Sequence, residues 1–266
     1  MNRTADPVAT PPGAVPVREA ATVALVRDAR VGGGLEVFLQ HRVATMQFAA
    51  GMSVFPGGGV EPRDYGGTRP WNGPDPHWWA EAFGIGEERA AAAVRGVVRE
   101  LFEETGVLLA EPEPEPEPEP GPDSAATGPD SAATGLANPG DRPGPRERRA
   151  LDAGEGDLDS LLAAHRLVLS AHLLRPWDRW TTPPGPPRRY DTLFFVAAVP
   201  PGAEPDGVTS EARAVGWMRA DDAATAGTLG RLGMLRPTLD VLADLATATD
   251  VAELLATVRS IAPGGN

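Results

Sequence analysis

The sequence predicts a mixed α/β or α+β fold in a single domain. Segments with the pattern of strands precede, interrupt and follow segments with the pattern of helices, which is typical of this class. The chain has 266 residues, of which 41% are hydrophobic, enough to bury a sizeable core. An acidic, Pro-rich segment interrupts elements that belong to one core. We therefore expect one domain over residues 18–262, after a flexible, Pro-rich lead-in over residues 1–17.

The predicted strands are short apolar runs bounded by turn-forming residues. They lie at residues 20–27, 35–41, 52–55, 173–182, 190–199 and 214–218. The first two are joined through Gly32, Gly33 and Gly34, which favour a turn.

Helical patterns cover residues 87–105, 158–169, 237–247 and 251–261. The first helix has Glu87 and Glu88 at its positive end, and Gly106 follows its last turn as a left-handed cap would. Gly96 lies in its interior, where it costs about 1 kcal/mol relative to Ala. This helix therefore needs tertiary support or a reason for a small residue.

Two segments fit neither pattern. Residues 62–86 are rich in Gly, Pro and Trp and predict an irregular, partly packed insert. Residues 111–148 begin with five Glu-Pro repeats, followed by two copies of GPDSAAT. Pro prevents a helix there and the Glu charges repel one another, so we expect a solvated, disordered linker.

Composition excludes several function classes. The 24 basic and 37 acidic residues give a net charge of −13, which argues against nucleic acid or an anionic membrane as the main partner. The chain contains no Cys and no Lys, which excludes thiolate zinc sites, cysteine nucleophiles, a Walker A loop and a lysine Schiff base. Carboxylates, arginines, backbone amides and a hard metal ion are left for chemistry.

The hydropathy pattern predicts a soluble, cytoplasmic protein. No stretch approaches the roughly 20 apolar residues that a membrane helix needs. The first residues carry Pro and Asp where a signal peptide needs an apolar core.

Three carboxylates are predicted to share one face of the helix at 87–105. Glu100, Glu103 and Glu104 stand at i, i+3 and i+4, so all three project in the same direction. Like charges at this spacing repel each other and call for a compensating cation. That cation is either an arginine or a Mg²⁺ or Mn²⁺ ion, both of which prefer oxygen ligands.

Together with a glycine-rich segment upstream, this cluster resembles the Nudix box. The loop half matches at residues 54–61 (VFPGGGVE) and the helical half at residues 99–107 (RELFEETGV). In the uninterrupted box a Glu lies eight residues before the Arg, and here that position is Ala91. Glu61 and Asp64 either stand in for the missing acid or cap the insert.

The two halves of the box are separated by the insert, and a split box is a feature of one Nudix subgroup. The chain resembles the acyl-coenzyme A diphosphatases of the peroxisomal type. Further matches are EVFL at 36–39 with Arg42, GMSVFPGG at 51–58 and RRYDTLFF at 188–195. The resemblance implies an α/β/α sandwich with a mixed sheet, an insert within the box and C-terminal helices.

The resemblance also implies an activity. It is metal-dependent hydrolysis of CoA or acyl-CoA to 3′,5′-ADP and (acyl-)4′-phosphopantetheine, with Mg²⁺ or Mn²⁺ as cofactor. The implied metal ligands are Glu100, Glu104, Glu103 directly or through water, and a backbone carbonyl of Gly57 or Gly58. Arg99 orients these carboxylates.

The general base stays open between a box residue such as Glu103 and a later loop residue, Glu204 or Glu211, of which Glu211 has the better context. Phosphate-gripping candidates are Arg42, Arg188 and Arg189.

Tyr190, Phe48 or a Trp of the insert is a candidate for stacking on adenine, and Met46 with Phe48 suits a pantetheine arm.

Two alternatives remain at this point. One is a Nudix pyrophosphatase acting on ADP-ribose, NADH or dinucleoside polyphosphates. The other is a non-catalytic Nudix module that senses a nucleotide, against which the three retained glutamates argue. In each case the partner is a small-molecule nucleotide, not nucleic acid or a membrane. The oligomeric state stays open, a homodimer included.

Overall fold

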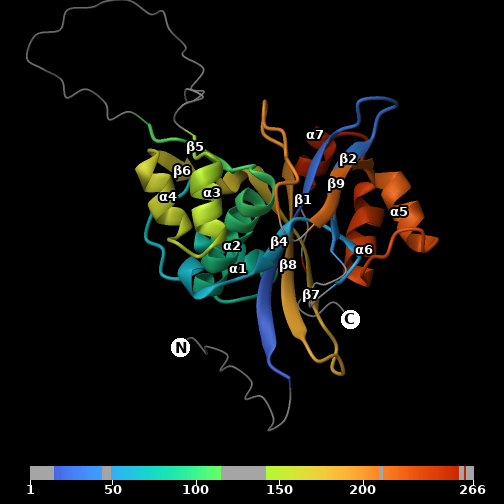
Figure 1. The fold of residues 1–266 in the computed structure, drawn as a ribbon, viewed down its shortest axis with the longest axis horizontal. Helices are drawn as coiled ribbons and strands as arrows, with labels where there is room; N and C mark the ends of the chain where they lie inside the picture. Colours follow the sequence, from blue (N-terminus) through green and yellow to red (C-terminus); the bar gives the residue numbers. More distant parts are fainter. Residues whose placement is uncertain (1–14, 44–48, 115–141, 210–211, 258–260, 262–266) are drawn as a thin grey trace, which may run out of the picture.

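Three layers make up the protein, with a mixed sheet between two groups of helices (Figure 1). The structure is a computed structural model, and it describes residues 15–43, 49–114, 142–209, 212–257 and 261. The predicted α/β/α sandwich with a mixed sheet is confirmed. None of the described helices has both the length and the apolar character needed to span a bilayer.

Within the described residues, seven strands form the main sheet, with β3-β2-β1-β8-β7 as its central path, β4 paired to β1 and β9 paired to β2. Their bounds are β1 Val17–Asp28, β2 Leu35–Arg42, β3 Ser53–Val54, β4 Gly57–Gly59, β7 Leu174–Thr181, β8 Arg189–Ala198 and β9 Ala212–Arg219. Only β1 and β8 pair in parallel, and the other pairs in this sheet are antiparallel. The β1–β2 turn has three successive glycines with positive φ, as predicted for Gly32, Gly33 and Gly34.

The alternating side chains of β1 divide the core in two. Ala21, Val23 and Leu25 face one group of helices, whereas Ala24 and Val26 face the other. The first group is α1 Pro76–Phe83, α2 Glu87–Thr105, α3 Pro145–Asp152 and α4 Leu158–Ala164, and the second is α5 Ala220–Thr228, α6 Arg236–Leu245 and α7 Val251–Ala256. Both faces of the sheet are therefore covered.

The helix α2 has the predicted bounds. It ends at Gly106, whose φ of 74° is the expected left-handed cap. The reason for Gly96 is also visible, because a Cβ there would lie 3.1 Å from Oδ2 of Asp64. A small residue lets the short 3-10 turn η1 Pro62–Asp64 pack directly on α2.

Part of the insert is regular, so the prediction of irregular structure was wrong for residues 76–83. Asp75 accepts a hydrogen bond from the backbone N–H of Trp78 and begins α1, with Pro76 in the first turn. Trp79 is fully buried and stacks on Phe83.

The predicted linker and the helix after it also need correction. Residues 110–112 form β5 Ala110–Pro112, which pairs with β6 Leu167–Leu169, and residues 145–152 form α3. The helix predicted to reach 169 ends at 164, because Arg166 adopts a positive φ of 53° and the chain turns into β6. The rest of the predicted linker, residues 115–141, lies outside the described residues. At the C-terminal side, α5 was not predicted, and α7 ends at 256 instead of 261.

A buried charge network fixes β8 against β7 and α2. The carboxylate of Asp191 accepts bonds from Arg179 at 3.0 and 2.7 Å and from Arg89 at 2.8 Å. Arg89 also pairs with Glu19 on β1. Burial alone would raise the pKa of Asp191, but the two arginines outweigh it and lower the pKa to about 2.

We expect Asp191→Asn to destabilise the protein by about 2 kcal/mol at neutral pH. The folded pKa lies below the unfolded one, so this contribution is complete above about pH 4 and is lost as the pH falls toward 2. Urea unfolding of the wild type and of Asp191→Asn between pH 7 and pH 2 measures the difference in their unfolding free energies. This difference should shrink as the pH falls. Asp222→Asn, on the exposed first turn of α5, controls for the lost charge. A difference in unfolding free energy that does not change with pH would contradict the lowered pKa of Asp191.

Candidate active site

The glycine turn Gly57–Gly59 pairs with β1 as β4 and leaves no room for a side chain at Gly57 or Gly58. Gly57 is level with Thr22, and its φ is 148°. A Cβ on Gly57 would lie 2.4 Å from the carbonyl oxygen of Ala21, and one on Gly58 would lie 2.5–2.6 Å from the carboxylate of Glu100. The glycines therefore bring the backbone against both the sheet and the helix α2.

Two carboxylates of α2 border this turn. The backbone N–H of Gly57 donates to Oε2 of Glu104 at 2.8 Å. The carboxylate of Glu100 lies directly against Gly58. These side chains come from the last two turns of a 19-residue helix, and the i, i+4 spacing predicted from the sequence puts both on the side that faces the turn.

Arg99 lies behind these carboxylates and is fully buried. Its Nε and Nη2 donate to the two oxygens of Asp64 at 2.8 and 2.9 Å, and Nη2 also donates to the carbonyl of Gly59 at 2.9 Å. Nη1 reaches Glu100 at 2.9 Å and Glu103 at 3.0 Å. Burial alone would lower the pKa of Arg99, but the surrounding carboxylates raise it, so the guanidinium stays charged.

Asp64 is the main partner of Arg99 in the insert. It is 2% exposed and forms a forked pair with Arg99. Asp64 also accepts the backbone N–H of Glu61 and so closes the turn η1. The side chain of Glu61 pairs with Arg63 instead.

Glu103 is held differently from the other two carboxylates. Its Oε2 accepts a bond from Arg99, and its Oε1 accepts one from Arg63 at 3.2 Å. Burial raises the pKa of Glu103, while both arginines oppose that rise. Each carboxylate oxygen of Glu103 is thus bonded to an arginine.

Comparison with solved structures finds 61 similar chains. One is a crystal structure of a NUDIX hydrolase from Alicyclobacillus acidocaldarius, 28% identical, with 92% of this chain and 98% of that chain covered and a TM-score of 0.68. It has the same fold, and this chain carries the box residues around one glycine turn. These likenesses support a Nudix hydrolase.

Looser matches include a MutT NUDIX hydrolase from Burkholderia pseudomallei, 15% identical over 88% of this chain and 99% of that chain with a TM-score of 0.39. A C. elegans Ap4A hydrolase is 10% identical over 85% and 93% of the two chains, with a TM-score of 0.40. No family model matches the sequence, and no curated protein matches it.

Nudix hydrolases generally use divalent metal ions. Among the described residues, no three His, Asp or Glu side chains are gathered closely enough to hold such an ion. The donor set nevertheless fits a hard cation, because two carboxylates and the backbone oxygens of one glycine turn lie together.

The predicted substrate residues are not all near this turn. Arg189 donates from Nε to the carbonyl of Thr182 at 3.0 Å. The backbone N–H of Tyr190 donates to the side-chain hydroxyl of Thr182. Arg189 is level with Val17 in the sheet, whereas Phe194, five residues along β8, is level with Thr22 beside Gly57. Gly59, at the other end of the turn, is level with Ala20, three residues from Val17, so at about 3.3 Å per residue Arg189 lies about 10 Å along the sheet from Gly59 and about 16 Å from Gly57.

Arg42 is better placed. It ends β2 on the sheet face shared with Phe38, which packs in the same core as α2, and its backbone N–H donates to Met52 O. Glu204 is exposed in the loop before β9. Glu211, Phe48 and Met46 lie outside the described residues.

Sequence reasoning missed two arginines that touch the box. Arg63 could have been noticed because it lies beside Asp64 and the box loop. Arg148 lies beyond the acidic repeats, far in sequence from either half of the box, and no local pattern distinguishes it from other arginines.

We expect Asp64→Ala to cost about 3–5 kcal/mol of unfolding free energy, because it leaves the buried guanidinium of Arg99 without its main partner. Urea unfolding measures the loss. The matched control is Asp240→Ala, which removes an exposed partner of Arg236 and should cost less than about 1 kcal/mol. Equal losses in the two variants would show that the Asp64–Arg99 pair is not a structural requirement.

Proposed function

We propose that this protein hydrolyses the diphosphate bond of a small molecule in which a nucleoside diphosphate is linked to another group, with a divalent metal ion as cofactor. One observation carries the proposal. Glu100 and Glu104 border the same glycine turn, which has no room for a side chain at Gly57 or Gly58, and Arg99 is anchored behind them by Asp64.

The residues suit this chemistry. A diphosphate carries adjacent negative charges that repel a nucleophile, and a bound Mg²⁺ or Mn²⁺ neutralises them and makes a water molecule more acidic. Glu100 and Glu104 supply the carboxylates that hold the ion, with a backbone carbonyl of Gly57 or Gly58 beside them. Arg99 keeps the carboxylates in place and offsets their mutual repulsion.

The general base we propose is Glu211. The alternative within the box, Glu103, has both carboxylate oxygens already bonded to arginines. Arg99 does not contact the reaction directly in this proposal, since its guanidinium is occupied by Asp64, Glu100 and Glu103.

For substrate we propose CoA or acyl-CoA. The split box supports this choice, because an insert separates the glycine turn from α2 as in the subgroup that the sequence resembles. Arg42 is the proposed phosphate contact, since it lies on the sheet face covered by α2.

Glu100→Gln and Glu104→Gln should each lower turnover by at least about 100-fold, because each removes a metal-binding charge. Both variants should fold, since the loss of a like charge from one helix face relieves repulsion. Product release from CoA, followed with and without added Mn²⁺, measures the effect. Glu88→Gln, on the exposed first turn of the same helix, is the control. Turnover near that of the wild type in both variants would refute the metal assignment.

Metal-dependent product release from a panel of CoA, acyl-CoA, dephospho-CoA, ADP-ribose, NADH and diadenosine polyphosphates identifies the preferred substrate. Wild-type protein should prefer CoA or its acyl esters. A preference for ADP-ribose, NADH or the diadenosine compounds would overturn the CoA assignment and leave the diphosphatase assignment standing. No metal-dependent product from any member would overturn the proposed activity itself.

Arg42→Ala should abolish the preference for CoA over dephospho-CoA. CoA carries a 3′-phosphate that dephospho-CoA lacks, and a charged contact to that group is worth about 1.5–3 kcal/mol, or roughly ten- to hundredfold in kcat/KM. The same two substrates are then tested on Arg189→Ala, which should keep the preference because Arg189 is bonded to the carbonyl of Thr182 at the start of β8. The opposite result would identify Arg189 as the phosphate contact.

A further inference from the structure

Arg148 is a buried arginine that reaches the active-site helix from outside the Nudix box. It lies on α3 and is only 7% exposed. Its Nε donates to the backbone carbonyl of Glu103 at 2.9 Å, and Nη1 donates to both carboxylate oxygens of Asp206 at 2.7 and 2.9 Å. Nη2 donates to the carbonyl of Val208 at 3.1 Å. One guanidinium thus joins α3, the last turn of α2 and the loop before β9.

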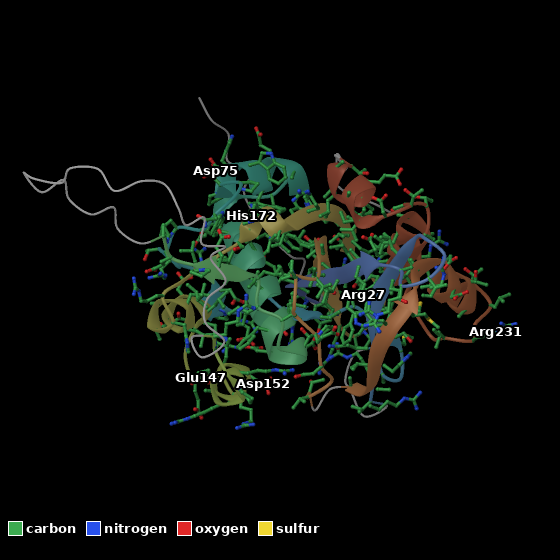
Figure 2. All side chains as sticks on the ribbon, turned by 90° about the horizontal axis from the view of Figure 1, so that it is seen from above. Arg27, Asp75, Glu147, Asp152, His172 and Arg231 are labelled. Atoms are coloured by element: carbon green, nitrogen blue, oxygen red, sulfur yellow. The ribbon has the colours of Figure 1, made fainter. Side chains whose placement is uncertain are left out.

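Arg148 contacts α2 at its C-terminal end, where backbone carbonyls need hydrogen-bond partners from outside the helix. The last carbonyls of a helix have no partner within the helix and form its negative end, so a cation there is favourable. The last turn includes Glu103 and Glu104. Gly106 makes the approach possible, because a Cβ at this residue would lie 3.0 Å from Nη1 of Arg148. In Figure 2, α3, marked by Glu147 and Asp152, lies beside α2 and away from the helices on the other face.

The contact to the loop is equally specific. The backbone N–H of Asp206 donates to the carbonyl of Thr105 at 2.9 Å, so the loop is attached to the end of α2 directly as well as through Arg148. Gly207 lies on Val215 of β9, where an added Cβ would come within 2.6 Å of a methyl group. Residues 206–208 are therefore held between the end of the box helix and β9.

We infer that Arg148 is a positioning residue of the active site. It fixes the turn that carries Glu103 and Glu104 relative to the loop 206–208. Stability alone is a weak reason to bury this charge, since apolar residues of similar volume are often as stabilising. What an apolar residue cannot do is bond the carbonyls of Glu103 and Val208 and the carboxylate of Asp206 at once. As a statement about turnover, this inference rests on the proposed function.

The test compares Arg148→Met, Arg148→Lys and Asp206→Asn with wild type. The control is Arg149→Met, since Arg149 is the next residue of α3 and is exposed. Misplacement of catalytic groups by small shifts costs up to about 100-fold, so kcat on the preferred substrate should fall about 10- to 100-fold in Arg148→Met, with KM within about twofold of wild type. Arg148→Lys should recover part of the loss. Asp206→Asn should show a smaller loss, and Arg149→Met none.

Two readouts need no substrate. Binding of Mn²⁺ alone should weaken at least about threefold in Arg148→Met. Hydrogen exchange of the Gly106 and Asp206 amides should accelerate at least about tenfold, while the core amides of β1 keep their protection. If no substrate of the panel is hydrolysed by wild type, the proposed activity fails and these two readouts still decide the role of Arg148.

If Arg148→Met does not fold, Asp206→Asn decides, because Asp206 is half exposed and its loss leaves the bond to Glu103 intact. Unchanged Mn²⁺ binding, exchange and kcat in the folded variants would overturn the inference. An equal fall in kcat in Arg149→Met would overturn it as well.

Discussion

The forked ion pair between Arg99 and Asp64 is the interaction on which the active site depends. Arg99 is fully buried and carries its charge into a low-dielectric interior, which is costly unless every donor finds an acceptor. Asp64, Glu100, Glu103 and the carbonyl of Gly59 provide those acceptors. The same bonds join the glycine turn, the insert and the box helix, so a box interrupted in sequence is continuous in space.

Close backbone approach is the second constraint. The turn Gly57–Gly59 pairs with β1 on one side and touches Glu100 and Glu104 on the other, at separations that exclude a Cβ at Gly57 and Gly58. Gly96 within α2 likewise permits a close contact, because its missing side chain lets the carboxylate of Asp64 lie against the helix. Glycine loses more conformational entropy on folding than other residues, which lowers stability. At these positions a larger residue would prevent the close contacts just described.

The chain contains arginine as its only strong base, and the structure uses that residue where lysine would serve less well. Arg95, Arg99 and Arg148 are all nearly buried, and each bonds to several oxygens at once. A guanidinium offers five donors in a planar fork, whereas an ammonium offers three on a flexible stem. Buried arginines can therefore act as junctions between elements that are distant in sequence, as Arg148 joins α3, α2 and the loop before β9.

The sequence by itself determined the strands β1, β2, β7, β8 and β9, the helix α2 with its glycine cap, and the grouping of Glu100, Glu103 and Glu104. Each of these follows from a local period or a local turn signal. Only the tertiary structure decided that Asp64 and not Glu61 holds Arg99, that β5 pairs with β6, that Arg189 is level with Val17 in the sheet, and that Arg148 reaches α2. These features join residues between 35 and 59 positions apart or depend on strand register, and no local pattern encodes which distant partner satisfies a buried charge or a backbone carbonyl. The helix α1 is an intermediate case, since Asp75-Pro76 is a local start signal that the surrounding glycines and prolines obscured.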